Sequence, residues 1–298
     1  MGHVHSDHKK RSHLIISIVL NLITTIAEII GGIASGSLAL LSDALHNLSD
    51  VFALSVSLVA VELQKFDQTE TRTFGFKRAE VLAALLNAAI LIVVSVYLFK
   101  EAYARFLHPV SINTTVMLIV AVIGLAANAV SVLVLRKDAH DNMNIRTAYV
   151  HLFSDTLSSV AVIAGGMCIW FFGVRWIDPL LTVIIGVYVL KEGYEIVMEA
   201  VDILMQNAPK GISITDIKND IERIEGVKDF HHAHIWSVTE NRIFLEAHIN
   251  VSKDVLISET CLLKDKIEQL LKAKYSISHT TLQFEYDSCR NVPLIKPE

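Results

Sequence analysis

Cysteine is scarce in this sequence, and neither sign of charge dominates it. The three cysteines, Cys168, Cys261 and Cys289, form no C-x-x-C pair and no disulfide ladder, which suits a domain on the reducing side of a membrane. A formal net charge of −5 gives no indication of nucleic-acid binding. The zinc-enzyme motif H-E-x-x-H is absent as well, which disfavours a metal-dependent intramembrane enzyme.

Hydrophobic residues, by contrast, are abundant. They make up 52% of the 298 residues, against roughly 45–50% in soluble domains. Nearly all long apolar runs lie between residues 14 and 200, whereas residues 208–298 have the composition of a soluble domain. The runs are close to the roughly 20 residues that a helix needs to cross a bilayer. We therefore expect six membrane-spanning helices, at about 13–34, 38–62, 79–104, 112–135, 145–171 and 177–199.

Basic residues in the predicted loops indicate the orientation of the chain. They gather before the first span, between the second and third, and between the fourth and fifth, at Lys9, Lys10, Arg11, Lys65, Arg72, Lys77, Arg78, Arg136, Lys137 and Arg146. The opposite loops carry only Arg105 and Arg175. Because cytoplasmic loops are enriched in basic residues, both termini should be cytoplasmic. The chain then divides into an N-terminal tail (1–12), a transmembrane domain (13–207) and a cytoplasmic domain (208–298).

The cytoplasmic domain has its own pattern of elements. Hydrophobic periodicity predicts helices over 212–224 and 256–274, and strands over 227–238, 243–251 and 278–286. The order α-β-β-α-β in so short a segment predicts a two-layer α+β domain.

The same charged pattern occurs twice inside hydrophobic sequence. His46 and Asp50 are separated by one helical turn in the second predicted span, and His151 and Asp155 repeat that spacing in the fifth. Residues four apart share a helix face, so two such helices can bring two imidazoles and two carboxylates together. This ligand set suits zinc, and its two carboxylates balance the charge of a divalent ion. Because an empty cage would hold uncompensated carboxylates, protons should replace the metal.

Plainer interpretations of these polar residues remain. Each His-Asp pair could be only a contact between helices. Asp43, two turns before Asp50, would either attract cations at the outer mouth or mark a helix start near water. Glu28, inside the first span, is expected to pair with Asn21 or with another helix.

The cytoplasmic domain contains a second group of candidate ligands. They are His231, His232, His234, His248, Cys261, His279, Gln283 and Glu285. In a regular strand His232 and His234 share a face and His231 points the opposite way, so one ion could use all three only if the strand bends. The N-terminal tract of His3, His5, His8 and His13 would either collect metal or form a solvated tail.

Several strings together resemble the cation diffusion facilitator family, in its zinc-transporting branch. Besides the two H-x-x-x-D pairs, they are Ser42-Asp43-Ala44, Phe74-Gly75-Phe76-Lys77-Arg78-Ala79-Glu80, Phe230-His231-His232-Ala233-His234-Ile235-Trp236 and His279-Thr280-Thr281-Leu282-Gln283-Phe284-Glu285. The resemblance covers nearly the whole chain. It implies a homodimer with a ferredoxin-like (metallochaperone-like) cytoplasmic domain, which exports Zn²⁺ in exchange for protons by alternating access.

The resemblance also implies roles for particular residues. It places the transport site at His46, Asp50, His151 and Asp155, and a cytoplasmic metal site at His231, His248, Gln283 and Glu285, with Cys261 at a further ligand position. Other members carry histidine where Gln283 and Cys261 stand. A basic residue that locks the two protomers matches Arg78 or Lys77, with Asp202 as a candidate partner.

The expected location and function follow from these matches. The long His-rich loop of many eukaryotic relatives is absent, which favours a prokaryotic plasma membrane. We therefore expect a divalent-metal/proton antiporter and not an enzyme, with Zn²⁺ as the main substrate and Cd²⁺, Co²⁺ or Fe²⁺ as additional ones. A sensor that binds metal without transporting it is the alternative.

Overall fold

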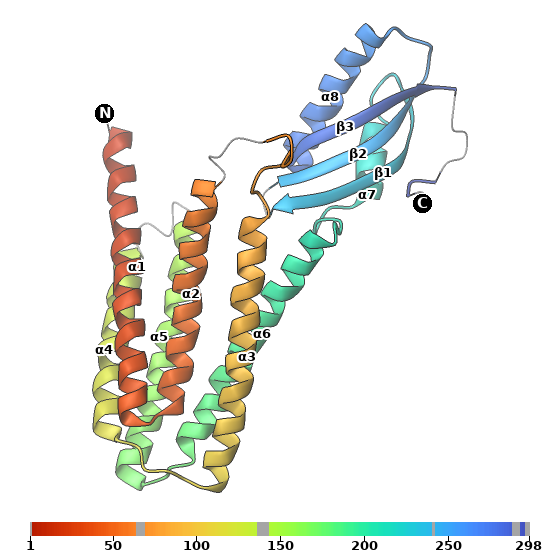
Figure 1. The fold of residues 1–298 in the computed structure, drawn as a ribbon. Coiled ribbons are helices and arrows are strands. Elements are labelled where there is room, and N and C mark those ends of the chain that lie inside the picture. Colours follow the sequence, from red (N-terminus) through yellow and green to blue (C-terminus); the bar gives the residue numbers. More distant parts are fainter. Residues whose placement is uncertain (1, 64–68, 136–142, 240–241, 288–292, 296–298) are drawn as a thin grey trace. The chain divides into compact units, whose positions relative to one another are not determined.

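The computed structural model describes residues 2–63, 69–135, 143–239, 242–287 and 293–295 (Figure 1). Side chains are described in these ranges except at 2–18, 53–58, 60–62, 134–135, 143–148 and 150–151. The chain forms two compact units, of which the first comprises residues 1–59 and 84–197 and the second comprises residues 60–83 and 198–298.

Each of the six long apolar runs forms one helix. In chain order these are α1 (Gly2–Ser35), α2 (Leu38–Leu63), α3 (Ala79–Leu107), α4 (Thr114–Leu135), α5 (Met143–Phe172) and α6 (Ile177–Leu204). Three described segments, Ala79–Leu107, Thr114–Leu133 and Leu152–Phe172, are long and apolar enough to cross a membrane. The first helix begins at Gly2, well before the expected residue 13, because no proline or glycine interrupts residues 3–30.

The first unit is held together by close helix contacts. Helix α4 packs against both α1 and α5. Small residues allow the approach to α1: a Cβ at Gly124 would lie 2.5 Å from Glu28 Oε1, and one at Gly31 would lie 2.6 Å from Val120 Cγ2. Large apolar side chains such as Ile33 and Phe172 remain exposed, as expected for a surface that faces lipid.

The second unit contains the predicted α+β domain. Its elements are α7 (Ile214–Ile221), β1 (Val227–Thr239), β2 (Arg242–Val251), α8 (Ile257–Tyr275) and β3 (Ile277–Tyr286). The sheet order is β1-β2-β3, with β1 and β2 antiparallel and β2 and β3 parallel. The predicted order of elements and the two layers are therefore confirmed.

The two faces of this sheet differ in chemistry. Both helices cover one face, where Ile217 of α7 and Leu271 of α8 pack in a core with Phe230, Leu245 and Ile249. The opposite face carries the polar and aromatic side chains in cross-strand rows. From one end to the other these rows are Trp236-Phe244-His279, His234-Glu246-Thr281, His231-His248-Gln283 and Asp229-Asn250-Glu285.

Candidate metal centres

Helices α2 and α5 bring three of the four predicted transport ligands together. His46 Nε2 lies 3.9 Å from Asp50 Oδ2 on its own helix and 3.5 Å from Asp155 Oδ1 on α5. His46 and Asp155 are buried, and Asp50 is partly exposed. His151 lies one turn before Asp155 on α5, but its side chain is outside the described residues. The described geometry thus brings one carboxylate of α2 and one of α5 to the same nitrogen of His46.

A further carboxylate, from α6, completes this cluster. Glu192 Oε2 lies 3.3 Å from His46 Nδ1, and ligand atoms of His46, Asp50 and Glu192 all lie within 4.8 Å of one another. Glu192 was not among the ligands predicted from the sequence. A carboxylate within a predicted span is itself a signal of function, and that signal could have found it.

The polar residues near this cluster form contacts between helices. Glu28 Oε2 on α1 accepts a hydrogen bond of 2.9 Å from Asn47 Nδ2 on α2, so the expected pairing of Glu28 with another helix is confirmed. Asp43 accepts a hydrogen bond from the Ser158 hydroxyl on α5. Asp43 is buried in the second turn of α2, so the interpretation as a helix start near water is wrong, whereas the outer-mouth role stays a prediction.

Strand β1 bends between His231 and His234, and this bend brings candidate metal ligands of the cytoplasmic domain to one face of the sheet. His231 pairs with His248 and His234 with Glu246, so three steps on β1 match two on β2. The extra residue is a β-bulge in which His232 has a left-handed φ of 48°. The backbone N–H groups of His232 and Ala233 donate to the carbonyl oxygens of Pro293 and Leu294. The bulge puts His231 and His234 on one face, which a regular strand would not do.

The cytoplasmic cluster centres on Glu285 of β3. His248 Nδ1 lies 2.8 Å from Glu285 Oε1, and His231 Nε2 lies 3.6 Å from Glu285 Oε2. Gln283 Nε2 donates to Glu285 Oε1 at 2.8 Å. These residues provide two imidazoles and a carboxylate for a divalent ion.

Asp229, which the sequence motifs did not single out, orients His231. Its Oδ2 lies 2.8 Å from His231 Nδ1. Burial disfavours the charged carboxylate, but the Lys218 ammonium, 2.7 Å from Oδ1, prevails and holds the pKa of Asp229 below its ordinary value. A charged Asp229 therefore favours the tautomer of His231 that presents Nε2 to Glu285. Its place two residues before His231 on the strand was the available signal.

The remaining cytoplasmic candidates lie at different distances from this cluster. The His232 ring centroid is 4.6 Å from that of His248 and 5.4 Å from that of His234. His279 instead stacks on Phe244, and Cys261 is exposed on α8, so in the described residues neither joins the three clustered ligands. The side chains of His3, His5, His8 and His13, and all of Cys289, lie outside the described residues.

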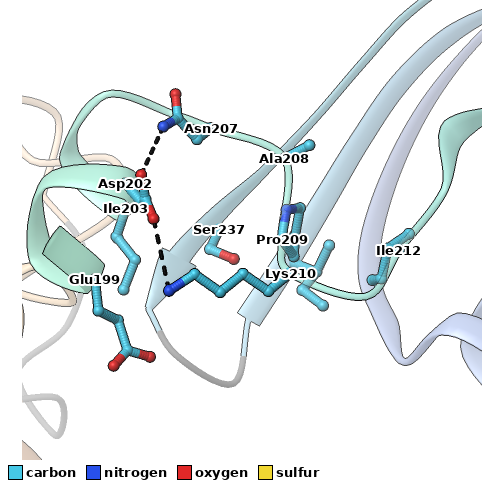
Figure 2. Close-up of a pocket in the computed structure, with 10 residues that line it drawn as sticks. Glu199, Asp202, Ile203, Asn207, Ala208, Pro209, Lys210, Ile212 and Ser237 are labelled. Atoms are coloured by element: carbon cyan, nitrogen blue, oxygen red, sulfur yellow. Dashed lines mark hydrogen bonds and ion pairs between the residues drawn. The ribbon is translucent and has the colours of Figure 1, made fainter. Parts of the chain in front are cut away.

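Asp202 has partners within its own chain. It accepts a hydrogen bond of 2.7 Å from Asn207 Nδ2 and lies 3.9 Å from Lys210 Nζ, in a cavity of about 220 Å³ at the end of α6 (Figure 2). Lys77 and Arg78 line another cavity, and in the described part of the chain neither pairs with a carboxylate. Burial, together with Arg242, lowers the pKa of Lys77. The suggested pairing of Asp202 with these cations is therefore not formed within one protomer.

A protein with long apolar helices and two clusters of nitrogen and oxygen ligands is, by class, a membrane protein that handles metal ions. Two family models make this specific. The cation efflux transmembrane domain matches residues 14–205, and the cytoplasmic domain of cation efflux proteins matches residues 209–287. The chain belongs to the cation efflux family, which places it among transporters rather than enzymes.

Similar proteins support the same assignment. The chain is 40% identical to a cadmium, cobalt and zinc/H⁺-K⁺ antiporter of Bacillus subtilis, over 97% of this chain and 93% of that protein. It is 37% identical to the metal cation efflux system protein CzcD of Cupriavidus metallidurans, over 97% and 91%. It is 34% identical to the zinc transporter ZitB of Pectobacterium atrosepticum, over 97% and 89%.

Proposed function

We propose that this protein exports divalent metal ions, Zn²⁺ foremost, from the cytoplasm in exchange for protons. The observation that carries the proposal is the meeting of His46 with carboxylates from α2 and α5. With His151 as the fourth ligand, the two aspartates would neutralise a divalent ion. The same two charges would need protons once the ion leaves. Exchange of metal for protons then follows from charge balance.

Alternating access would move the ion across the membrane. In this mechanism six spans enclose the site, and rocking of the helices opens it first to the cytoplasm and then to the opposite side. Both termini would be cytoplasmic and the membrane would be a prokaryotic plasma membrane. A nitrogen and oxygen cage also accepts Cd²⁺, Co²⁺ or Fe²⁺, so selectivity among metals is not strict. The name of one relative includes cadmium and cobalt besides zinc, which supports these two additional metals.

The cytoplasmic domain would sense metal and stabilise a homodimer. We propose a ferredoxin-like fold for it, consistent with the two-layer αββαβ arrangement. Metal bound by His231, His248 and Glu285 would join two neighbouring strands and the edge strand β3. Gln283 and His232 are the nearest additional donors. Binding there at high cytoplasmic zinc would then favour the transporting form of the dimer.

Transport by vesicles tests the proposal. The full chain is reconstituted with its cytoplasmic side outward, a zinc-sensitive dye in the lumen and the lumen more acidic than the bath. Wild type should take up zinc, and Asp50→Ala or Asp155→Ala should abolish uptake. Glu195→Ala is the matched control, because Glu195 is exposed on α6 and its ion pair among the described residues is with exposed Lys191. Uptake by Asp50→Ala at the wild-type rate would contradict the proposal.

Two further arms of this assay define the substrate and the coupling ion. Competition by Cd²⁺, Co²⁺, Fe²⁺ and Mn²⁺ measures selectivity. Because one relative is named an H⁺-K⁺ antiporter, uptake is compared with and without luminal K⁺. Proton release on zinc binding without any flux would favour a sensor over a transporter.

A further inference from the structure

The imidazole of His46 lies between two groups of carboxylates. Its Nε2 faces Asp155 Oδ1 at 3.5 Å and Asp50 Oδ2 at 3.9 Å, and its Nδ1 faces Glu192 Oε2 at 3.3 Å. The His46 side chain is 4% exposed, whereas that of Glu192 is 32% exposed. The three acids therefore differ in the nitrogen that they face: Asp50 and Asp155 face Nε2, and Glu192 faces Nδ1.

A neutral imidazole carries its proton on one nitrogen and a lone pair on the other. The hydrogen bond made by one nitrogen decides which nitrogen is free to bind metal. A carboxylate at Nδ1 favours the tautomer with hydrogen at Nδ1 and directs the lone pair of Nε2 towards Asp50 and Asp155. We propose that Glu192 is the positioning residue that holds His46 in this tautomer, so that α6 prepares the ligand that α2 provides. This inference rests on the proposed transport function.

Helix α6 contacts the ring at a second point. The ring of Tyr188, one turn before Glu192, meets the His46 ring edge-on, with centroids 5.6 Å apart and an interplanar angle of 77°. Residues four apart lie on the same helix face, so Tyr188 and Glu192 reach His46 together. Tyr188 restricts the tilt of the ring while Glu192 selects the nitrogen that binds.

The cytoplasmic cluster has the same order of groups. Asp229 lies 2.8 Å from His231 Nδ1, and His231 Nε2 faces Glu285 at 3.6 Å. In both clusters one carboxylate faces Nδ1 and another carboxylate faces Nε2 of the same histidine. Histidine ligands in metal proteins commonly have such an outer partner, and its loss typically costs about 10–100-fold in metal affinity.

Direct binding of the ion by Glu192 is the competing role. A third carboxylate beside Asp50 and Asp155 would leave a net negative charge around a divalent ion. The two roles predict different behaviour for Glu192→Gln. The amide oxygen of glutamine still presents a partial negative charge to Nδ1, so a positioning role survives this change, whereas a ligand that contributes a full negative charge does not.

The experiment compares Glu192→Gln, Glu192→Ala and the control Glu195→Ala in the full-length protein. Zinc binding is measured in detergent, and KM and kcat for zinc uptake are measured in vesicles. We expect Glu192→Ala to raise the Kd and KM for zinc about 10–100-fold with a smaller change in kcat. Glu192→Gln should stay within about threefold of wild type, well inside that loss. Wild-type affinity in Glu192→Ala, or equal losses in both variants, would overturn the inference.

Nitrogen NMR of His46 gives a readout that does not depend on transport. The wild type and Glu192→Gln should show the Nδ1–H tautomer, and Glu192→Ala should show a mixture of both tautomers. A wild-type spectrum from Glu192→Ala would also overturn the inference. The Asp50→Ala variant separates the two proposals: if it is inactive while Glu192→Ala binds zinc normally, only the positioning role fails. If Asp50→Ala transports normally, the transport site itself fails.

Discussion

Asp178 joins the first turns of two helices, and its removal should destabilise the first unit. This fully buried residue of α6 accepts hydrogen bonds from Ser37 Oγ at 2.5 Å, Leu38 N at 2.9 Å and Ala39 N at 3.3 Å. It therefore caps the N-terminus of α2 from a different helix, where a negative charge also complements the helix dipole. We expect Asp178→Asn to weaken the attachment of α2, the helix that carries His46.

The loss of unfolding free energy in Asp178→Asn depends on the hydrogen-bond donors that Asp178 accepts from, because the backbone donors among them cannot reorient. Replacement of an ordinary N-cap costs roughly 0.5–2 kcal/mol, and a buried donor left without its acceptor costs roughly 1–3 kcal/mol more. In Asp178→Asn one oxygen becomes an NH₂ group, which would face the N–H of Leu38 or of Ala39, and a backbone N–H in a helix cannot reverse its direction. The expected loss is therefore about 3 kcal/mol, the sum of these two costs near the middle of their ranges. Ser37→Ala removes one of the three donors to Asp178 and also the hydroxyl that accepts from Leu40 N at 3.2 Å, so it should cost about 1–2 kcal/mol.

Unfolding in mixed micelles titrated with SDS measures both variants against wild type. The ratio of the two losses is informative, because general damage to the helix bundle would not rank the carboxylate above the hydroxyl. A loss for Asp178→Asn below about 0.5 kcal/mol, typical of a surface substitution, would refute the capping role. A larger loss for Ser37→Ala than for Asp178→Asn would refute the reasoning from charge.

Two predictions concern the cytoplasmic domain. Hydrogen bonds from Lys274 and Tyr275 hold the pKa of Asp220 below its ordinary value of 3.8. Its contribution to stability is therefore present above that pH and lost as pH falls through the lowered folded value. Hydrogen-exchange protection of α7 and α8 should fall in this acid range, and Asp220→Asn should remove part of the fall. If the variant shows the same acid profile as wild type, the stabilising role of Asp220 is contradicted. At the cytoplasmic metal cluster, Glu285→Ala should weaken zinc binding by at least about tenfold, since even the loss of a residue that only orients a metal ligand lowers affinity by that factor. Titration of full-length protein that also carries Asp50→Ala isolates this site, and unchanged affinity would contradict its assignment.

Much of this structure could be predicted because the signals are local. Apolar runs gave all six long helices, and alternating hydrophobicity gave the three strands with their helices in the correct order. The meeting of His46 with Asp155 was also predicted, because each H-x-x-x-D pair occupies one helix face and burial of these residues needs a partner.

What could not be predicted depends on contacts between distant segments. Glu192 follows a lysine near the end of an apolar run, which is also how a helix looks where it enters water. Only packing of α6 against α2 shows that its carboxylate meets His46. The cap at Asp178 is equally non-local, since nothing in its neighbouring sequence indicates the first turn of α2.

The bulge at His232 adds one imidazole, a possible metal ligand, to β1 without changing which side chains of the strand face inward. Phe230 before it and Ala233 after it both remain buried, although they are three residues apart. Deletion of His232 would restore a regular pleat with these two side chains still inward and His231 still outward. A histidine can thus be gained or lost here by insertion or deletion of a single codon. Elsewhere in a strand, such a step would move every following side chain to the opposite face of the sheet. Lineages of such proteins could change the number of imidazoles at this position while the fold around it stays the same.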